Sequence, residues 1–354
     1  MNKEGSLSIN SENIFPIIKK WLYSDHDIFF RELVSNGCDA VTKLKKLDMI
    51  GEYTIPEGKE LCVKVTADAE TKTITFTDNG IGMDANEIDQ YINQIAFSGA
   101  RDFLDKYKDK TNDDQIIGHF GLGFYSAFMV ADRVTIDSLS YKEGAKAVHW
   151  ESDEGTSFEM TDSAKTEIGT TITLYLNEDS YEFCNEYRAK EILDKYCSFM
   201  PIPIYFEAIK TAEEQARIDE AEKKAKEEEE KRKAEEAAKK AADGEAAEAE
   251  TEAEPVEKAP ETPKPINETT PLWAKHPNEC TDEEYKEFYH RVFHDYKEPL
   301  FWIHLNMDYP FNLKGILYFP KINMEYDSLE GTIKLYNNQV FIADNIKEDI
   351  PEFL

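Results

Sequence analysis

One stretch constrains the fold more than any other, residues 27–47, which read DIFFRELVSNGCDAVTKLKKL. On a helix at about 100° per residue, its apolar side chains fall on one side and leave a narrow polar stripe. The stripe consists of Glu32, Asn36, Asp39 and Lys43. A solvated helix face is the ordinary interpretation. Asparagine is a poor helix former, however, and small residues flank it, which favours close packing there. A carboxylate and an amide one turn apart can activate a water and hold a hard cation, so the stripe is a candidate catalytic wall.

The composition indicates an acidic globular protein. The chain has 354 residues, which is long enough for two or three domains. It carries a formal charge of −31 and is 41% hydrophobic. The negative charge argues against broad contact with nucleic-acid phosphates or an anionic membrane. The five cysteines have no metal-binding or disulfide spacing. With no apolar signal segment and no apolar run of about 18 residues, we expect a cytoplasmic protein.

A change in composition divides the chain. Residues 211–265 contain 19 acidic and 11 basic residues, and no leucine, methionine, cysteine or aromatic residue. Such a segment cannot bury a core, so it is predicted to be an acidic low-complexity linker, part lone helix and part disordered. The expected organisation is therefore an N-terminal domain at 1–210, the linker at 211–265, and a second folded part at 266–354.

Hydrophobic periodicity predicts the elements of both folded parts. A polar, mobile segment is expected at 98–115. Residues 281–293 should form a helix with a Thr281 cap and Glu284 three residues later. Further helices are predicted at 12–24, 86–94, 124–132 and 182–199, and strands at 5–9, 61–67, 73–77, 134–136, 147–151, 156–160, 171–176, 202–209, 300–305, 315–319, 332–335 and 339–342.

The strand at 73–77 runs into Asp78-Asn79-Gly80-Ile81-Gly82-Met83. An ordinary turn explains Asp-Asn-Gly, because these residues favour turns. The functional interpretation is that Asp78 accepts a hydrogen bond from the exocyclic amine of a base. The glycines would then let the backbone approach a flat ring closely.

A second glycine motif is Gly118-His119-Phe120-Gly121-Leu122-Gly123, which leads into an apolar helix. Glycine-rich loops at helix N-termini bind phosphate through free N–H groups, although a flexible hinge has the same composition. The pattern is neither a Rossmann fingerprint nor a P-loop. Gly169-Thr170 opens a strand. Either the pair is only a turn, or the Thr170 side chain offers a hydroxyl to the same base as Asp78.

Taken in order, these motifs resemble the ATP-binding fold shared by DNA gyrase, histidine kinases, MutL and heat shock protein 90. Longer segments are similar to the heat shock protein 90 chaperones, and to their bacterial form most closely. They are RELVSNGCDAVTK, DNGIGM, GHFGLGFYSAFMVADRV and TTPLWAKHPNECTDEEYKEFYHRVF. The resemblance covers residues 6–206 and 267–354.

The resemblance implies an α+β fold. The ATP-binding domain would be a two-layer α/β sandwich, with a mixed or antiparallel sheet covered by helices. A charged linker and the first part of an α/β middle domain, which binds clients, would follow. The implied function is that of an ATP-dependent chaperone that assists protein folding under stress. Binding and slow hydrolysis of ATP, with Mg²⁺, would drive lid closure and N-terminal dimerisation. The implied partners are unfolded clients and, in the full-length protein, a second copy, with no nucleic acid or membrane.

The resemblance also assigns roles by position. Glu32 would be the general base, Asn36 the Mg²⁺ ligand, and Asp78 the acceptor of the adenine amine. A lid at residues 93–124 would close over the phosphates. The remaining implied nucleotide-binding residues are Asp39, Lys43, Gly82, Met83, Gly118, Phe120, Gly121, Gly123, Phe124 and Thr170.

Three departures from the family pattern stand out. Phe97 occupies a position where relatives often have lysine, and Tyr91 one where many have asparagine or histidine. Leu354 precedes both the arginine that reaches the γ-phosphate and the dimerisation domain, so a fragment with low activity is expected. A nucleotide-binding module that does not hydrolyse ATP is the main alternative. A DNA-acting ATPase would need a basic second domain, and a kinase a phosphoacceptor histidine helix; neither pattern is present in the sequence.

Overall fold

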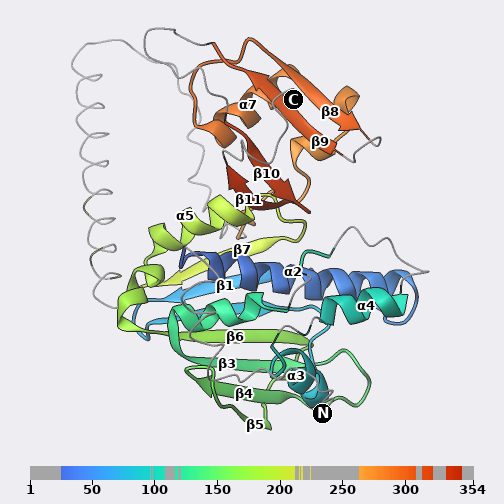
Figure 1. The fold of residues 1–354 in the computed structure, drawn as a ribbon, viewed down its shortest axis with the longest axis vertical. Helices are drawn as coiled ribbons and strands as arrows, with labels where there is room; N and C mark the ends of the chain where they lie inside the picture. The colour runs from blue at the N-terminus through green and yellow to red at the C-terminus, as the bar shows by residue number, and fades with distance from the viewer. Residues whose placement is uncertain are drawn as a thin grey trace, which may run out of the picture.

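The computed structural model describes residues 25–95, 97, 99–107, 116–118, 121–211, 215, 217, 224, 263–307, 313–321 and 332–344. They form a larger first domain and a smaller second domain above it (Figure 1). The strand predicted at 5–9, the helix predicted at 12–24 and nearly all of the predicted linker lie outside the described residues.

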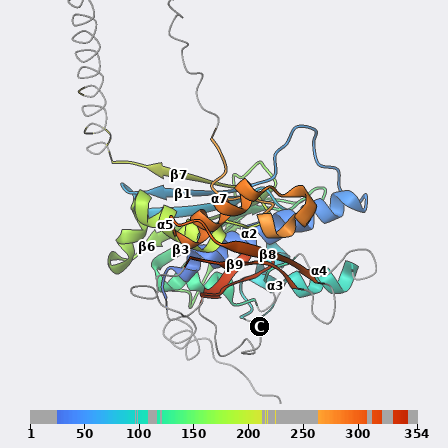
Figure 2. The ribbon, with the colours of Figure 1, turned by 90° about the horizontal axis from the view of Figure 1, so that it is seen from above.

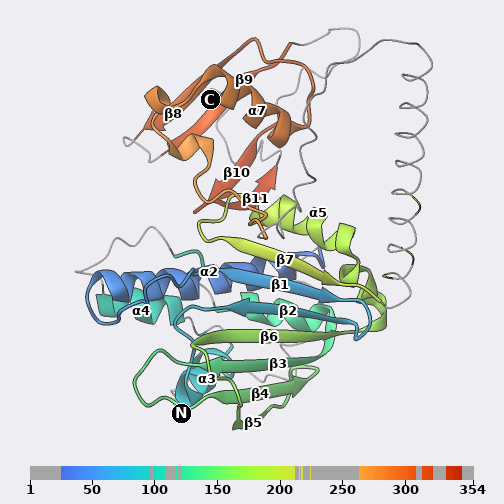
Figure 3. The ribbon, with the colours of Figure 1, turned by 180° about the vertical axis from the view of Figure 1, so that it is seen from behind.

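A seven-stranded sheet forms one layer of the first domain, in the order β5-β4-β3-β6-β2-β1-β7. All neighbouring strands are antiparallel except β1 and β7, which are parallel, so the sheet is mixed as expected. Figure 3 shows the strands in this order from behind. Their bounds are Val63–Asp68 (β1), Thr73–Asp78 (β2), Ala131–Leu139 (β3), Val148–Asp153 (β4), Glu159–Asp162 (β5), Gly169–Leu176 (β6) and Ile204–Ile209 (β7).

The long helix α2, Ile28–Met49, lies along the sheet and supplies the second layer with shorter helices (Figure 1). Its apolar side begins with Phe29 and Phe30, both fully buried, whose rings contact Phe76 of β2 and Phe183. Burial of these large rings holds the helix on the sheet. The predicted amphipathic helix and the α+β sandwich are therefore confirmed.

Other helices differ from the sequence predictions. The segment expected to be mobile, 98–115, contains α4, Gly99–Tyr107, because Phe103 and Tyr107 recur one turn apart and pack together. The apolar helix predicted at 124–132 is a short 3₁₀ helix, η3, Gly123–Met129.

The helix predicted at 182–199 is divided in two. Its parts are η4, Glu178–Cys184, and α5, Glu186–Cys197. Asn185 causes this break, since its side chain accepts the first free amides of α5 as an N-cap. Helix α3 spans Ala85–Tyr91.

The second domain is built on helix α7, Asp282–Phe293, and its predicted capping box is confirmed. The Thr281 hydroxyl accepts from the Glu284 amide, and the Glu284 carboxylate accepts from the Thr281 amide. Two antiparallel hairpins accompany the helix. Their strands are Phe301–Met307 (β8), Leu313–Phe319 (β9), Lys334–Asn337 (β10) and Val340–Asp344 (β11); the 3₁₀ turns η5, Leu272–Ala274, and η6, Pro277–Glu279, precede α7.

The two domains share apolar contacts at the end of α5. Phe199, which follows α5, packs its ring against Trp273, Phe288 and Tyr336 of the second domain. Phe341 of β11 contacts Tyr196 of α5 in return, with ring centroids 6.0 Å apart. Seen from above, the second domain overlies α2 and α5 (Figure 2).

Candidate functional site

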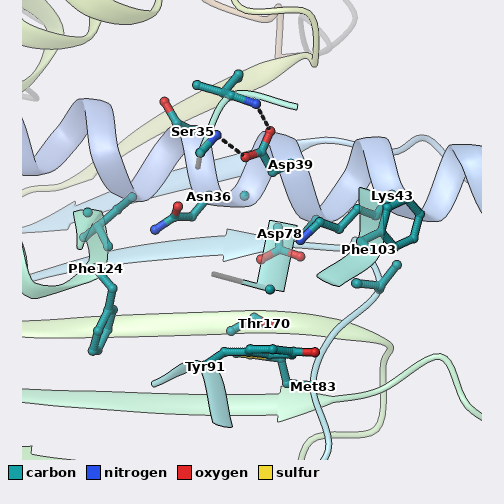
Figure 4. A pocket seen from close by; sticks show the side chains of 18 of the residues that line it. Ser35, Asn36, Asp39, Lys43, Asp78, Met83, Tyr91, Phe103, Phe124 and Thr170 are labelled. Atoms are coloured by element: carbon teal, nitrogen blue, oxygen red, sulfur yellow. Dashed lines mark hydrogen bonds between the residues drawn. The ribbon is translucent and has the colours of Figure 1, made fainter. Parts of the chain in front are cut away.

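A cavity of about 690 Å³ lies between α2, the adjoining strands and the described residues of the predicted lid. Twelve of the thirteen predicted site residues line it, from segments far apart in the sequence. The thirteenth, Phe120, lies outside the described residues. Figure 4 shows side chains from α2 facing Asp78, Met83 and Thr170 across this cavity. The twelve are Glu32, Asn36, Asp39, Lys43, Asp78, Gly82, Met83, Gly118, Gly121, Gly123, Phe124 and Thr170.

Helix α2 forms one wall through its polar stripe. Because the four stripe residues are spaced by three or four positions, their side chains stack along one side of the helix. Asn36 is exposed to the cavity, whereas Asp39 is buried. Burial lowers the pKa of Lys43, whose ammonium group lies 5.9 Å from the centre of the Phe103 ring.

Asp78 lies at the end of β2 and is only 9% exposed. Its carboxylate accepts a hydrogen bond from the Gly80 amide at 2.8 Å. Burial raises its pKa to about 7, because a carboxylate loses hydration there; the Gly80 hydrogen bond acts in the opposite direction. Thr170 is its register partner on β6, and the Thr170 hydroxyl is 2.9 Å from that of Ser138. This end of the cavity therefore presents a carboxyl group with Thr170 beside it.

The Asp-Asn-Gly segment packs too tightly for side chains at two glycines. A Cβ on Gly80 would lie 2.3 Å from the carbonyl carbon of Ala40 in α2. Gly82 has φ of +59°, and a Cβ there would lie 1.9 Å from the Leu139 carbonyl oxygen. The glycines thus bring the loop against α2 and β3, and the loop is more than an ordinary turn.

Residues 116–118, here called the strap, are held by Asp39. The amides of Ile117 and Gly118 each donate to a different oxygen of the Asp39 carboxylate, both at 2.8 Å. Figure 4 draws these two hydrogen bonds as dashed lines. The sequence indicated that Asp39 faces the pocket, but it gave no signal for the strap, because Ile117 lies 78 residues away.

Glu32 is paired with its neighbour Arg31. The Arg31 guanidinium donates twice to one carboxylate oxygen, from Nη2 at 2.6 Å and from Nε at 3.0 Å. The other oxygen faces Gly123, where a Cβ would lie only 2.4 Å away. Gly123 therefore leaves room for the carboxylate at the start of η3. The pairing of Arg31 with Glu32 was not predicted, although a basic residue directly precedes the predicted general base in the sequence.

Two of the departures from the family pattern, Tyr91 and Phe97, lie side by side. The rings of Tyr91 and Phe97 stack with centroids 6.0 Å apart, and both line the cavity. Gly99, the first residue of α4, lies against the Tyr91 ring, where a Cβ would be 3.1 Å from it. An aromatic pair thus occupies the part of the wall where the family pattern often has a lysine and an asparagine or histidine.

The cavity has the size and lining of a cofactor site. Cofactor pockets commonly have volumes of about 300–1,000 Å³ with a few placed polar groups. The described residues contain no group of three or more His, Cys, Asp or Glu side chains that could hold a metal ion. One exposed amide, Asn36, nevertheless suits a cation that takes most of its oxygen ligands from phosphate and water, as Mg²⁺ does. No helix in the described part of the chain is long and apolar enough to cross a membrane.

Comparisons with known proteins agree with this geometry. The family described as "Histidine kinase-, DNA gyrase B-, and HSP90-like ATPase" matches residues 28–178, and "Hsp90 protein" matches residues 182–354. Chaperone protein HtpG of Bacteroides fragilis is 47% identical over 352 residues, which is 99% of this chain and 45% of that protein. Its counterpart in Porphyromonas gingivalis is 43% identical over 354 residues, 100% of this chain and 46% of that protein.

The fold and the cavity thus define a domain of the HSP90-like ATPase class. The chain belongs to the heat shock protein 90 family. A more distant HtpG, from Desulfitobacterium hafniense, is still 33% identical over 96% of the chain. The chain spans about half the length of the curated relatives it matches.

Proposed function

We propose that the cavity binds adenine nucleotide with Mg²⁺, and that the chain hydrolyses ATP as part of a molecular chaperone. One observation carries the proposal: a buried carboxyl group, Asp78, stands at one end of a cavity of cofactor size. Burying a carboxyl group is costly even with the charges of Lys43 and Lys165 acting on it, so the burial of Asp78 needs a functional reason. Accepting a hydrogen bond from the adenine amine provides one.

The remaining residues have consistent roles in this proposal. Asn36 would supply one oxygen ligand to Mg²⁺, and the nucleotide phosphates would supply others. Amides of the glycine-rich loop at Gly121 and Gly123 would face the phosphates. The loop leads into the seven-residue 3₁₀ helix η3 rather than a long α-helix. Individual amides would therefore contribute more to phosphate binding than a helix dipole would.

Glu32 would orient the water that attacks the γ-phosphate. In the structure its carboxylate is paired with Arg31, so one oxygen is engaged and the other faces Gly123. A carboxylate oxygen that accepts both guanidinium hydrogen bonds is not free to orient a water. Catalysis would require this pair to loosen. The pair also supports the alternative, a module that binds nucleotide without hydrolysing it.

The wider function is proposed from the relatives, which are named chaperone proteins. In this proposal the bound partners are unfolded or partly folded proteins, and the full-length protein is a homodimer in the cytoplasm. Nucleotide binding would close residues 93–124 over the phosphates. Such closure sequesters the reaction from water and commits the substrate.

Calorimetry with Asp78→Asn tests the pocket assignment. The variant keeps the size of the side chain but replaces a charge-assisted acceptor, so we expect Mg²⁺·ADP affinity to fall by about tenfold or more. Glu60→Gln serves as a matched control, since this carboxylate lies outside the cavity and contacts the Tyr205 hydroxyl. Equal affinities of the wild type and Asp78→Asn would contradict the proposal.

A further inference from the structure

The hairpin formed by β10 and β11 reaches from the second domain to the nucleotide cavity. Three of its residues, Asn337, Val340 and Ile342, line the same cavity as Glu32. At its tip, the side-chain amide of Asn338 donates to the main-chain carbonyl oxygen of Ile116 at 3.1 Å. The second domain thus contacts the strap directly.

The Ile116–Ile117 peptide unit is held from both sides. Its carbonyl accepts from Asn338 of the second domain, and its N–H donates to Asp39 of α2. The next amide, that of Gly118, donates to the other Asp39 oxygen. Ile116 itself is fully buried, which fixes the strap between these contacts. Buried main-chain groups are costly to leave unpaired, so each contact restrains the strap.

The hairpin is shaped to present Asn338. Asn337 pairs with Val340, and the two residues between them have positive φ, 48° at Asn338 and 66° at Gln339. This is the conformation of a tight two-residue hairpin turn, in which asparagine is favoured. Val340 and Phe341 are 2% and 8% exposed and belong to the apolar core of the first domain. The position of the Asn338 amide is therefore set by packing on both sides.

We propose that Asn338 is a positioning residue of the nucleotide site, which holds the strap against Asp39. The effect of Asn338 on nucleotide binding rests on the proposed function, because Gly118 begins the glycine-rich loop that is proposed to face the phosphates. Docking of the hairpin and this position of the strap then favour each other. By linkage, a nucleotide that needs the strap in this position also stabilises the docked hairpin.

Hydrogen exchange in the complete 354-residue chain, without nucleotide, tests the contact itself. Asn338→Gly keeps the left-handed backbone but deletes the donor, and Asn338→Asp keeps the shape but cannot donate. Gln339→Gly is the matched control, since the Gln339 amide nitrogen, oriented to donate, reaches the Phe199 carbonyl oxygen at 2.6 Å instead of the strap. We expect exchange at the Ile117 and Gly118 amides to accelerate about fivefold in both Asn338 variants only, the effect of one lost hydrogen bond.

Faster exchange confined to the hairpin, or exchange at Ile117 and Gly118 equal to that of Gln339→Gly, would overturn the inference. Calorimetry with Mg²⁺·ADP then measures the consequence, with affinity expected to fall about fivefold in the Asn338 variants and to remain unchanged in the control. If the wild type binds no nucleotide while the exchange difference persists, the proposed function fails and the strap contact stands. If the wild type binds and the Asn338 variants bind equally well, the positioning role fails alone.

Discussion

The two domains bury their apolar residues differently. In the first domain, central strands of the seven-stranded sheet bury large apolar side chains; Leu174 of β6 and Ile136 of β3 are fully buried. In the second domain, β8 and β9 pack one face against α7 and expose the other. That exposed face is apolar, with Ile303 and Leu317 both 44% exposed and directly paired.

This difference distinguishes the domain that forms most of the cavity from the domain that adds one hairpin to it. The first domain encloses a core and positions the cavity with its own α2, β2 and β6. The second domain contributes the β10–β11 hairpin to that cavity, while its β8–β9 face is uncovered by other described residues. Apolar faces of this kind mark contact surfaces in folded proteins. The chemistry is therefore expected to depend steeply on the first domain and moderately on the second.

The largest expected effect is that of Glu32→Ala. If Glu32 orients the attacking water, hydrolysis of ATP should fall by about 10²–10⁴-fold, the usual contribution of a general base. Affinity for Mg²⁺·ADP should be retained, because Glu32 lies against Gly123 and would not contact the adenine that Asp78 is proposed to bind. Phosphate release and calorimetry measure the two quantities. Lost affinity would assign Glu32 to the structure of the site, and unchanged hydrolysis would remove it from the mechanism.

A pair of leucines sharpens the comparison of the domains. Leu174→Ala removes a fully buried side chain from the first domain and should lower the free energy of unfolding by about 2–5 kcal/mol. Leu317→Ala removes the same atoms from the exposed β8–β9 face and should cost about 1 kcal/mol or less. Urea denaturation followed by circular dichroism measures both. Similar losses would mean that the β8–β9 face is covered in solution.

The smallest expected effect is a pH dependence of binding. Since burial raises the pKa of Asp78 to about 7, the neutral acid accumulates below pH 7 and cannot pair with the adenine amine as a carboxylate does. Affinity for adenosine, which has no titrating phosphate, should therefore fall about tenfold from pH 8 to pH 6. Asp78→Asn should abolish this dependence. A wild-type affinity independent of pH would show that Asp78 does not titrate in the site.

The same pKa shift makes the stability of the fold depend on pH in the direction opposite to binding. The unfolded chain releases the Asp78 proton near pH 4, whereas the folded domain keeps it until about pH 7. The contribution of Asp78 to the free energy of unfolding therefore decreases as the pH rises through this interval, and it is constant above it. A stability profile of the first domain measured beside the binding profile would separate the two effects.

Local patterns of the sequence predicted most elements of both domains. The helix at Ile28–Met49 follows from its period of 3.6, and the capping box of Thr281 and Glu284 follows from their spacing. Predictions from hydrophobic periodicity were wrong where other contacts decided the structure. Helix α4 has few apolar residues, but Gly99 packs against the Tyr91 ring, and the Asn185 cap interrupts a helix that periodicity alone would continue.

The sequence by itself determined which residues could form the site, because the order and spacing of the motifs are local properties. Only the tertiary structure decided their partners. Asp39 binds the strap, and Asn338 reaches across from the second domain. The physical reason is that hydrogen-bond donors lie wherever the folded backbone brings them, and loop closure over 78 or 222 residues leaves no local pattern in the chain.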